Sequence, residues 1–573
     1  MISRTHWWLL CLIVALSSAS VGAQVASPSP AAQTSKSGTI KGRVVNEKGQ
    51  PLANARVSIR AFGSMNPGQS TITDHDGRFE VSGLERLNYQ VLAWLSAYAP
   101  QARNPTDTQS NNVRVGDSVT LVLTKGGVIT GTVTTQTGEP VVRVRVRARM
   151  IRDSNLLPGP YAQLSMERTT DDRGVYRIYG LPAGTYIVWA GGSGFNPGND
   201  PFARDVPTYA PGSTRDEAAE ITVHPGEEIS NVDIRYRGEV GHIVSGTVIS
   251  PPTDQQMGGV GIELTSVKDA GVQWSSMRTS HAQQGLGFSF QGVDDGEYYV
   301  TARSFLPNQE WALSPSKRIT VRGEDVTGIE LVAQPLGSVS GRVMLEESKA
   351  SECTDKQRPL FSETLISAWH KETEATKQLP RFVWGLGAPV SPDAEGNVRV
   401  RNLSPGDYRF AAQFAGKYWY LQSISLKTQS AKPIDAARIW TTIKSSERLS
   451  GLTVTLAHGA ASLRGQMKIA EGETLPEKLM AYLVPAEREK AEDVLRYFAV
   501  AVTPDGKIAF NNLAPGRYWI VAQTANDDRS PLTKLRLPDA TEMRSMLRRA
   551  AEAAKTEIEF KPCQQIADFR LPI

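Results

Sequence analysis

The sequence predicts an all-β chain built as a tandem array of about five β-sandwich modules. Two short patterns recur five times at intervals of roughly 100 residues, the size of one small sandwich and too long for a solenoid repeat. One pattern is a strand with a central glycine, and the other is a turn-forming phrase that ends in a tyrosine. About seven short strands fit into each interval, enough for two packed sheets.

Each expected module opens on a strand that contains an apolar residue, a spacer, a glycine, a spacer and a second apolar residue. This alternation places one set of side chains inside and the other set in water. A glycine inside a strand marks either a bulge or the close approach of another backbone. The five openers are residues 40–44, 129–133, 244–248, 339–343 and 463–467.

The tyrosine phrase follows in the second half of each module. Its fullest form, residues 180–186, turns the chain with proline and glycine and starts an apolar strand with the tyrosine. A tyrosine at such a corner can bury its ring and bond its hydroxyl to nearby backbone. We therefore expect a structural role for the five corner tyrosines, Tyr89, Tyr186, Tyr298, Tyr408 and Tyr518.

Composition is that of an ordinary globular protein. The 573 residues are 40% hydrophobic and 21% charged, with a net charge of +4 and no long block of one sign, so nothing points to nucleic acid as a partner. The densest basic run alternates with apolar residues, which predicts a solvated strand face, with an anionic-ligand patch as the alternative. Its members are Arg143, Arg145, Arg147 and Arg149.

The N-terminus has the pattern of a cleaved secretory signal over residues 1–23. Arg4 and His6 precede an apolar stretch, and small residues end at Ala23. Residues 24–37 are rich in Ser, Ala, Pro and Gln and are expected to be a flexible leader. No later segment approaches the roughly 20 apolar residues of a spanning helix. We expect a secreted or periplasmic chain without a transmembrane segment after signal cleavage.

The cysteines predict one disulfide. Removal of the signal with Cys11 leaves Cys353 and Cys563, an even pair in a compartment that permits disulfides. Cys353 follows the opening strand of the fourth module and Cys563 precedes the last strand of the fifth. The bond would therefore join two neighbouring modules.

Helix is expected only in the fifth module. A short helix near the C-terminus runs from Asp539 to about Lys555, with Asp539 and Glu542 as a start that resembles a capping box. A shorter helix spans residues 487–497. The packing face of the first would contain Met543, Met546, Leu547, Ala550 and Ala554.

The openers, a mid-module Asp/Gly turn and the tyrosine phrase together resemble the carboxypeptidase regulatory-like domain, a transthyretin-like or prealbumin-like sandwich of Ig-like architecture. Residues 180–190 and 512–522 match that pattern closely, whereas the first module lacks the Pro-Gly pair and the third lacks the proline. The resemblance covers nearly the whole mature chain. The five sandwiches would be residues 38–125, 126–238, 239–335, 336–458 and 459–573.

No residue set predicts catalysis, a cofactor or a metal. A zinc peptidase needs several convergent His/Glu ligands and a general base, and the His224/Glu227 spacing lies in a turn without a second ligand segment. A sugar-binding surface would use exposed aromatic rings, because rings stack on the apolar faces of pyranoses. The candidates are Trp384, Tyr418, Trp419 and Tyr420, although alternate residues of such a strand must face the core.

The resemblance implies a binding or spacing role, because the family's sandwich accompanies metallocarboxypeptidases without performing the cleavage. We expect a non-catalytic protein that binds carbohydrate or a protein at the cell envelope. A purely structural spacer or stalk is the alternative from another class. A hydrolase or peptidase accessory is the third hypothesis.

Overall fold

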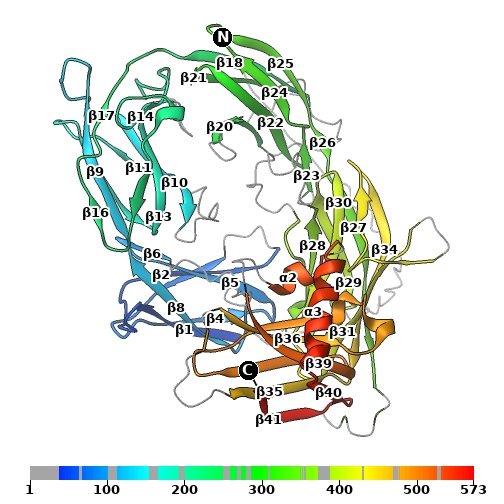
Figure 1. The fold of residues 1–573 in the computed structure, drawn as a ribbon. Coiled ribbons are helices and arrows are strands. Elements are labelled where there is room, and N and C mark those ends of the chain that lie inside the picture. Colours follow the sequence, from blue (N-terminus) through cyan, green and yellow to red (C-terminus); the bar gives the residue numbers. More distant parts are fainter. Residues whose placement is uncertain are drawn as a thin grey trace, which may run out of the picture.

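The computed structural model describes most of the chain after the expected leader (Figure 1). The described residues are 38–63, 68–100, 112–153, 165–192, 200–249, 259–267, 273–278, 286–306, 310–348, 350, 353, 357–371, 387–428, 432–468, 475–476, 478–525, 531–537 and 539–572. Strands dominate them, as predicted, and none of the helices found there is long and apolar enough to cross a membrane. The signal and leader ranges and Trp384 lie outside the described residues.

The first sheet of every module has the same order. The opening strand lies between a mid-module strand, paired antiparallel, and the closing strand, paired parallel. In chain order these sheets are β4 (Arg78–Leu84), β1 (Gly38–Asn46), β8 (Ser118–Lys125) and β6 (Tyr98–Pro100); β12 (Val175–Leu181), β9 (Gly127–Thr134) and β16 (Glu228–Ile229), with β17 (Ile234–Arg235) also on β9; β21 (Leu286–Val293), β18 (His242–Ile249) and β25 (Val326–Val332); β29 (Asn397–Leu403), β27 (Gly337–Glu346), β34 (Arg448–His458), β31 (Trp419–Leu426) and β32 (Ile434–Asp435); and β38 (Lys507–Leu513), β35 (Ala461–Lys468) and β41 (Gln565–Pro572).

The second sheet of each module is built on the strand that begins at the tyrosine phrase. In order these sheets are β3 (Gln69–Ile72), β2 (Arg56–Ala61), β5 (Asn88–Trp94) and β7 (Val113–Arg114); β11 (Ser165–Thr169), β10 (Arg145–Asp153), β13 (Gly184–Ala190) and β14 (Thr208–Tyr209), with β15 (Ile221–Val223); β20 (Gln273–Arg278), β19 (Val260–Ser266), β22 (Gly296–Leu306), β23 (Glu310–Leu313) and β26 (Gln334–Pro335), with β24 (Lys317–Val321); β28 (Leu365–His370), β30 (Gly406–Gln413) and β33 (Thr441–Ile443); and β37 (Phe498–Ala501), β36 (Leu479–Pro485), β39 (Gly516–Thr524) and β40 (Glu557–Phe560).

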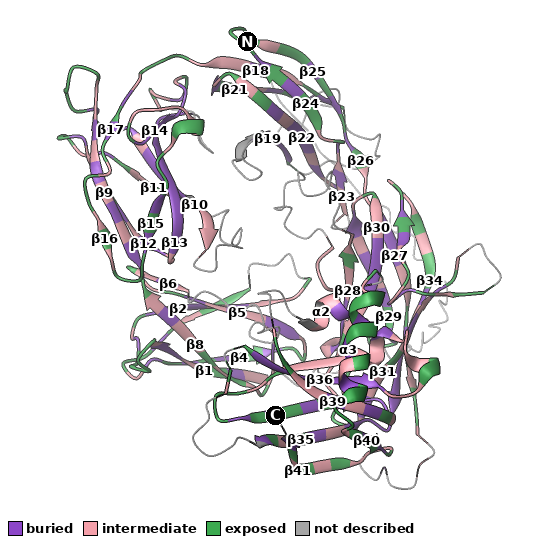
Figure 2. Cartoon of the chain, viewed as in Figure 1, coloured by how far each residue is buried: buried purple, intermediate pink, exposed green. Residues whose placement is uncertain are grey.

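Each pair of sheets encloses a separate apolar core. The apolar residues of the openers lie in these cores; Ile129 and Val133, for example, are fully buried in the second. Figure 2 shows the buried residues along the strands of each module. The fourth core also receives Val494, which belongs to the fifth module's range. Five cores of this kind are what period-2 patterning in five separate segments requires.

The glycine inside each opener is explained by close approach of another backbone. At Gly341 a side-chain carbon would lie 1.9 Å from the Leu452 carbonyl oxygen of the closing strand, and at Gly131 it would lie 2.0 Å from that of Val232. The equivalent distances are 2.3 Å at Gly42, 2.0 Å at Gly246 and 2.5 Å at Gly465. Any side chain there would force the parallel pair apart.

The C-terminal helix differs from the prediction in its start and in its buried face. Helix α3 (Thr541–Ala553) begins without a side-chain cap, and Met543 and Met546 are exposed. Arg544 is buried instead, because its guanidinium donates to the carbonyls of Leu535 and Leu537 at 2.9 and 2.6 Å. The preceding helix α2 (Pro531–Leu535) supplies Leu535. The helix expected over residues 487–497 is two 3-10 turns, Arg488–Lys490 and Val494–Arg496.

The arginines of β10 correct the expectation of a solvated strand face. Arg147 and Arg149 are buried, and Arg147 donates to Glu167 at 3.2 Å and to the Gly191 carbonyl at 3.0 Å. Arg145 pairs with Asp200 at 3.2 Å. The chain after β13 covers this face of the sheet, a tertiary contact that alternation within one strand does not reveal.

The five modules follow one another around an arc (Figure 1). The first module returns to touch the fourth: the Arg86 guanidinium lies 4.0 Å from the Glu363 carboxylate. Nearby, a side-chain carbon at Gly63 would lie 3.2 Å from the Pro389 carbonyl oxygen. The array therefore closes on itself rather than extending as a rod.

Candidate functional site

The five corner tyrosines make one repeated contact. Each hydroxyl donates a hydrogen bond to the backbone carbonyl four residues earlier, and each ring is buried. The five donor–acceptor distances are 2.9, 2.6, 2.9, 2.9 and 2.9 Å for Tyr89, Tyr186, Tyr298, Tyr408 and Tyr518. Burial raises the pKa of Tyr408 and of Tyr518 to about 12, because a buried phenolate would lose its hydration. These hydroxyls fasten the turn and do not line a site.

The joints between modules also repeat. A linker amide donates to a carbonyl in the segment that follows the tyrosine strand of the preceding module. The four bonds run from Gly126 to Ala97, from Gly241 to Arg204, from Leu336 to Trp311 and from Ala460 to Tyr418, at 2.8, 2.8, 2.9 and 2.8 Å. Every module from the second onward therefore contacts the preceding module through an equivalent backbone hydrogen bond.

The first residue of the tyrosine phrase lies against the same segment. It has a positive φ in all four joints, and it is glycine at Gly180 and Gly292 and asparagine at Asn402 and Asn512. A side-chain carbon at Gly292 would lie 2.5 Å from the Asp205 carbonyl oxygen. The asparagines use their side chains instead: Asn402 accepts from the Trp311 amide at 2.9 Å. Asparagine tolerates the left-handed conformation, so it can replace glycine and add hydrogen bonds.

The two ends of the array depart from this pattern. In the first module the equivalent residue is Gly83, and among the described residues no atom lies within 4 Å of a side-chain carbon built there. In the fifth module α2 and α3 occupy the segment after the tyrosine strand, and α3 packs on β36 and β39. The segment that receives the next module elsewhere is thus replaced by helices at the C-terminal end.

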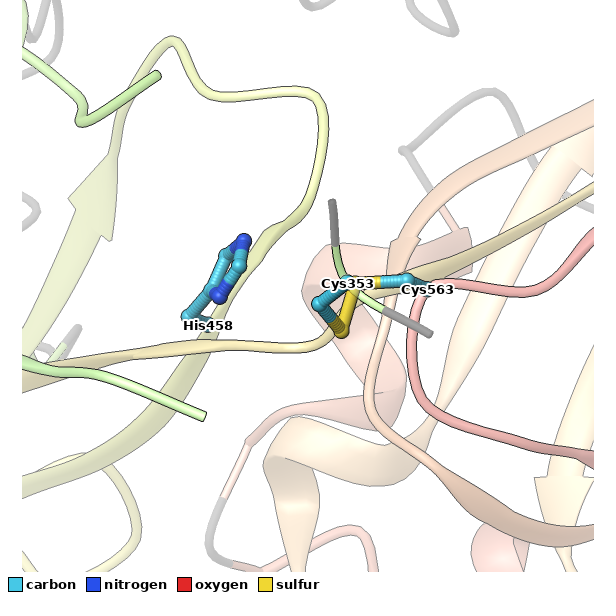
Figure 3. A group of neighbouring side chains, drawn as sticks. All are labelled: Cys353, His458 and Cys563. Carbon is cyan, nitrogen blue, oxygen red and sulfur yellow. A yellow bond between two sulfur atoms is a disulfide. The ribbon is translucent and has the colours of Figure 1, made fainter. Parts of the chain in front are cut away.

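The last joint carries the predicted disulfide. Cys353 and Cys563 are bonded with an S–S distance of 2.06 Å, which confirms the prediction. Figure 3 shows His458 beside them, and the candidate ligand atoms of the three residues lie within 4.8 Å of one another. Metals bind the thiolate form of cysteine, and both sulfurs here are held in the disulfide. This oxidised cluster is therefore a covalent cross-link and not a metal centre.

The predicted aromatic cluster lies at this joint and not on an open surface. Trp419 is fully buried, its indole NH donates to the Gln357 carbonyl at 3.0 Å, and its ring packs on His458. Asn512 donates to the Trp419 carbonyl at 2.7 Å, and Gln565 donates to the Tyr418 hydroxyl at 2.5 Å. The expectation that the Trp419 ring stacks on a sugar is therefore corrected: the strand turns this ring into the core of the fourth module.

An exposed tryptophan that the sequence reasoning missed lies on the outer face of the fourth module's second sheet. Trp369 in β28 is 44% exposed, and Arg409 in β30 is its cross-strand partner. The Arg409 guanidinium carbon lies 5.5 Å from the centre of the Trp369 ring. Alternation places Trp369 on the face opposite the buried Ile366, a signal that was available in the sequence.

Comparison with known proteins identifies the modules at the N-terminal end. Residues 39–124 and 128–237 each match the model of the carboxypeptidase regulatory-like domain. No curated protein gives a significant match. The two matched ranges carry the same openers, tyrosine corners and joint that the later modules repeat.

Comparison with solved structures gives matches of low sequence identity. They include the Bacillus anthracis TIE protein, with 14% identity over 52% of this chain and 50% of that chain and a TM-score of 0.13. A streptococcal ancillary pilin matches at 12% identity over 52% of this chain and 100% of that chain, with a TM-score of 0.16. A putative adhesin from Bacteroides ovatus matches at 8% identity over 30% and 73%, with a TM-score of 0.18. The chain thus spans half the length of the TIE protein, and TM-scores this low carry no argument about function.

Proposed function

We propose that this chain, whose first two modules are carboxypeptidase regulatory-like domains, is a non-catalytic binding protein of the cell envelope that is secreted or periplasmic. Its ligand class is carbohydrate or an envelope protein. The modules form a fixed frame, and the ligand is held on its surface. This reading gives no catalytic role to any residue.

The structural roles of the repeated residues are the observation that supports the proposal. The opener glycines allow the closing strand to approach, and the tyrosines form hydrogen bonds that stabilise turns. The first residues of the tyrosine phrases contact the preceding module. All of these uses concern shape. Repetition that preserves shape alone supports a scaffold whose binding groups lie outside the repeat.

The contact between the first and fourth modules favours this proposal over a stalk. A stalk separates its two ends, whereas the Arg86–Glu363 contact holds the first module against the fourth. A closed frame holds surfaces of different modules at fixed distances, which suits a ligand large enough to touch more than one module. Two contacts of one ligand raise its effective affinity without tighter individual sites.

A glycan array and an envelope-protein pull-down with the mature chain test the proposal, together with small-angle scattering. We expect ligand retention and a scattering profile of a closed particle. A rod-shaped particle that retains no ligand would favour the stalk. Stoichiometric zinc in the purified protein, with peptide hydrolysis that a chelator abolishes, would favour the hydrolase hypothesis.

A further inference from the structure

The outer face of the sheet β28-β30-β33 carries an arginine between two tryptophans. Trp369 pairs with Arg409 across β28 and β30. On the other side of β30, Tyr408 pairs with Thr441, and Trp440 directly precedes Thr441 in the chain. Lys371 lies two residues after Trp369, with its ammonium 5.9 Å from the centre of the Trp440 ring. Aromatic and cationic side chains thus form one row on this face.

Arg409 is buried without the partners that a buried cation needs. It is 5% exposed, and within the described part of the chain its Nε has no hydrogen-bond partner. Its contact with the Trp369 ring supplies a cation–π attraction and leaves the Nε donor unused. A buried ion costs several kcal/mol unless it is paired, so a guanidinium kept here needs a reason.

A second buried guanidinium nitrogen without a hydrogen-bond partner lies in the fifth module, among the residues described. Arg536 follows α2, and its Nε is also buried and has no hydrogen-bond partner among the residues described. Its Nη2 donates to the Tyr497 carbonyl at 3.4 Å. Burial first, and then the positive charge of Arg409, lower the pKa of Arg536 to about 10. The charge of Arg409 therefore acts on Arg536 across the boundary between the fourth and fifth modules.

One neighbouring carboxylate acts on Arg409 without bonding it. Asp539 is exposed, and its charge opposes the effect of burial, which lowers the pKa of Arg409. No hydrogen bond joins Asp539 to Arg409 among the described residues. Arg409 thus retains its Nε donor for an external anion.

We infer that Trp369, Arg409 and Trp440 form a binding site for an acidic sugar. Its carboxylate or sulfate group would accept from the Arg409 guanidinium, and its ring would stack on the exposed Trp369. A guanidinium presents a planar fork of donors that matches a carboxylate or sulfate in two-point contact. A tryptophan ring covers the apolar face of a pyranose. This inference rests on the proposed binding function and names its ligand class.

Calorimetric titration of the full mature chain tests the site with four probes. The probes are an oligogalacturonate, a heparin-derived oligosaccharide, a neutral galacto-oligosaccharide of equal length and inorganic sulfate. We expect one or both acidic oligosaccharides to bind and to quench tryptophan fluorescence, and the neutral one not to bind. The first two probes distinguish a carboxylate from a sulfate ligand.

The decisive variant is Arg409→Met, which keeps the length of the side chain and removes its charge. We expect it to weaken binding of the acidic oligosaccharide at least about tenfold, the loss of one charged hydrogen bond. Its thermal midpoint should be unchanged or higher, because an unpaired buried charge is gone. Trp369→Ala, at an exposed position, should weaken binding and remove the quench even if the Arg409 variant folds poorly. Arg173→Met, on a side chain that is 75% exposed in the second module, should bind like the wild type.

The outcomes separate this inference from the proposed function. A neutral glycan or an envelope protein that binds equally to wild type and Arg409→Met overturns the acidic-sugar site and leaves the binding function intact. Binding of inorganic sulfate alone overturns the assignment to a sugar. No binding of any acidic oligosaccharide overturns the inference outright.

Discussion

Replacement of Asn512 tests whether the joint between the fourth and fifth modules depends on one side chain. The amide nitrogen of Asn512 donates to the carbonyls of Gly416 and Trp419 at 2.6 and 2.7 Å, from a backbone with φ of 57°. Asn512→Gly keeps that conformation and loses both bonds. Asn512→Ala loses the bonds and also carries the strain of a left-handed residue.

The expected magnitudes follow from these contacts. Each hydrogen bond contributes about 0.5–1.5 kcal/mol, so Asn512→Gly should weaken the joint by about 1–3 kcal/mol. The left-handed conformation costs Asn512→Ala a further ~1–2 kcal/mol. Asn512→Asp should be the most damaging variant at neutral pH, because it directs a carboxylate at two carbonyl oxygens.

Hydrogen exchange at the Ala460 amide reports on this joint directly. That amide donates to the Tyr418 carbonyl at 2.8 Å and becomes accessible when the joint opens. Since 1.4 kcal/mol is a factor of ten, Asn512→Gly should speed its exchange roughly 5-fold to 140-fold. The disulfide keeps the two modules tethered, so the change should remain local.

Asn231 provides the matched control. It has φ of 61° and is exposed, away from the joints. Asn231→Ala therefore measures the strain of a left-handed alanine without a joint. The reasoning would be refuted if the Ala460 amide exchanged at the same rate in Asn512→Gly as in the wild type. Equal destabilisation by Asn512→Ala and Asn231→Ala would also refute it.

Three further outcomes are expected. Gly341→Ala should destabilise the fourth module by several kcal/mol and lower its thermal midpoint, since its side chain would lie 1.9 Å from a carbonyl oxygen; Gly287→Ala, where the nearest atom is 4.0 Å away, should cost about 1 kcal/mol or less. Cys353→Ser should leave both cores folded and speed exchange at the Cys563 amide, which donates to the Gly459 carbonyl; an unchanged rate would show that the bond adds nothing to the joint. Burial raises the Tyr518 pKa from 10.0 to about 12, so the folded chain holds this proton more tightly; its contribution is complete below pH 10 and is lost as the pH rises to 12, which alkaline unfolding of wild type and Tyr518→Phe would detect.

The fold was accessible from the sequence because its determinants are local and repeated. Opener glycines and corner tyrosines act within a single module, so their spacing predicts the sheets and the turns. The disulfide was accessible because two cysteines leave one pairing. The burial of Trp419 was left open, since alternation predicts that some residue of its strand faces the core without saying which.

The predictions from the sequence were wrong where one segment of the chain covers another. Arg147 is buried because the chain after the neighbouring strand β13 covers its face of the sheet, and Arg544 replaces the methionines on the buried face of α3 because carbonyls of the α2 region accept from it. The pair of Trp369 and Arg409 likewise depends on two neighbouring strands, β28 and β30. Strand alternation could have drawn attention to Trp369, but nothing in the linear order associates it with Arg409.

The contact between Arg86 and Glu363 limits which modules the chain can gain or lose. Because each joint uses the same backbone positions, duplication or deletion of one module would leave the remaining joints chemically satisfied. The closing contact would not survive, since an arc of three or five modules brings different residues to the meeting point. The count from the first module to the fourth is therefore held fixed by geometry, and α2 and α3 occupy the segment of the fifth module on which a further module would pack.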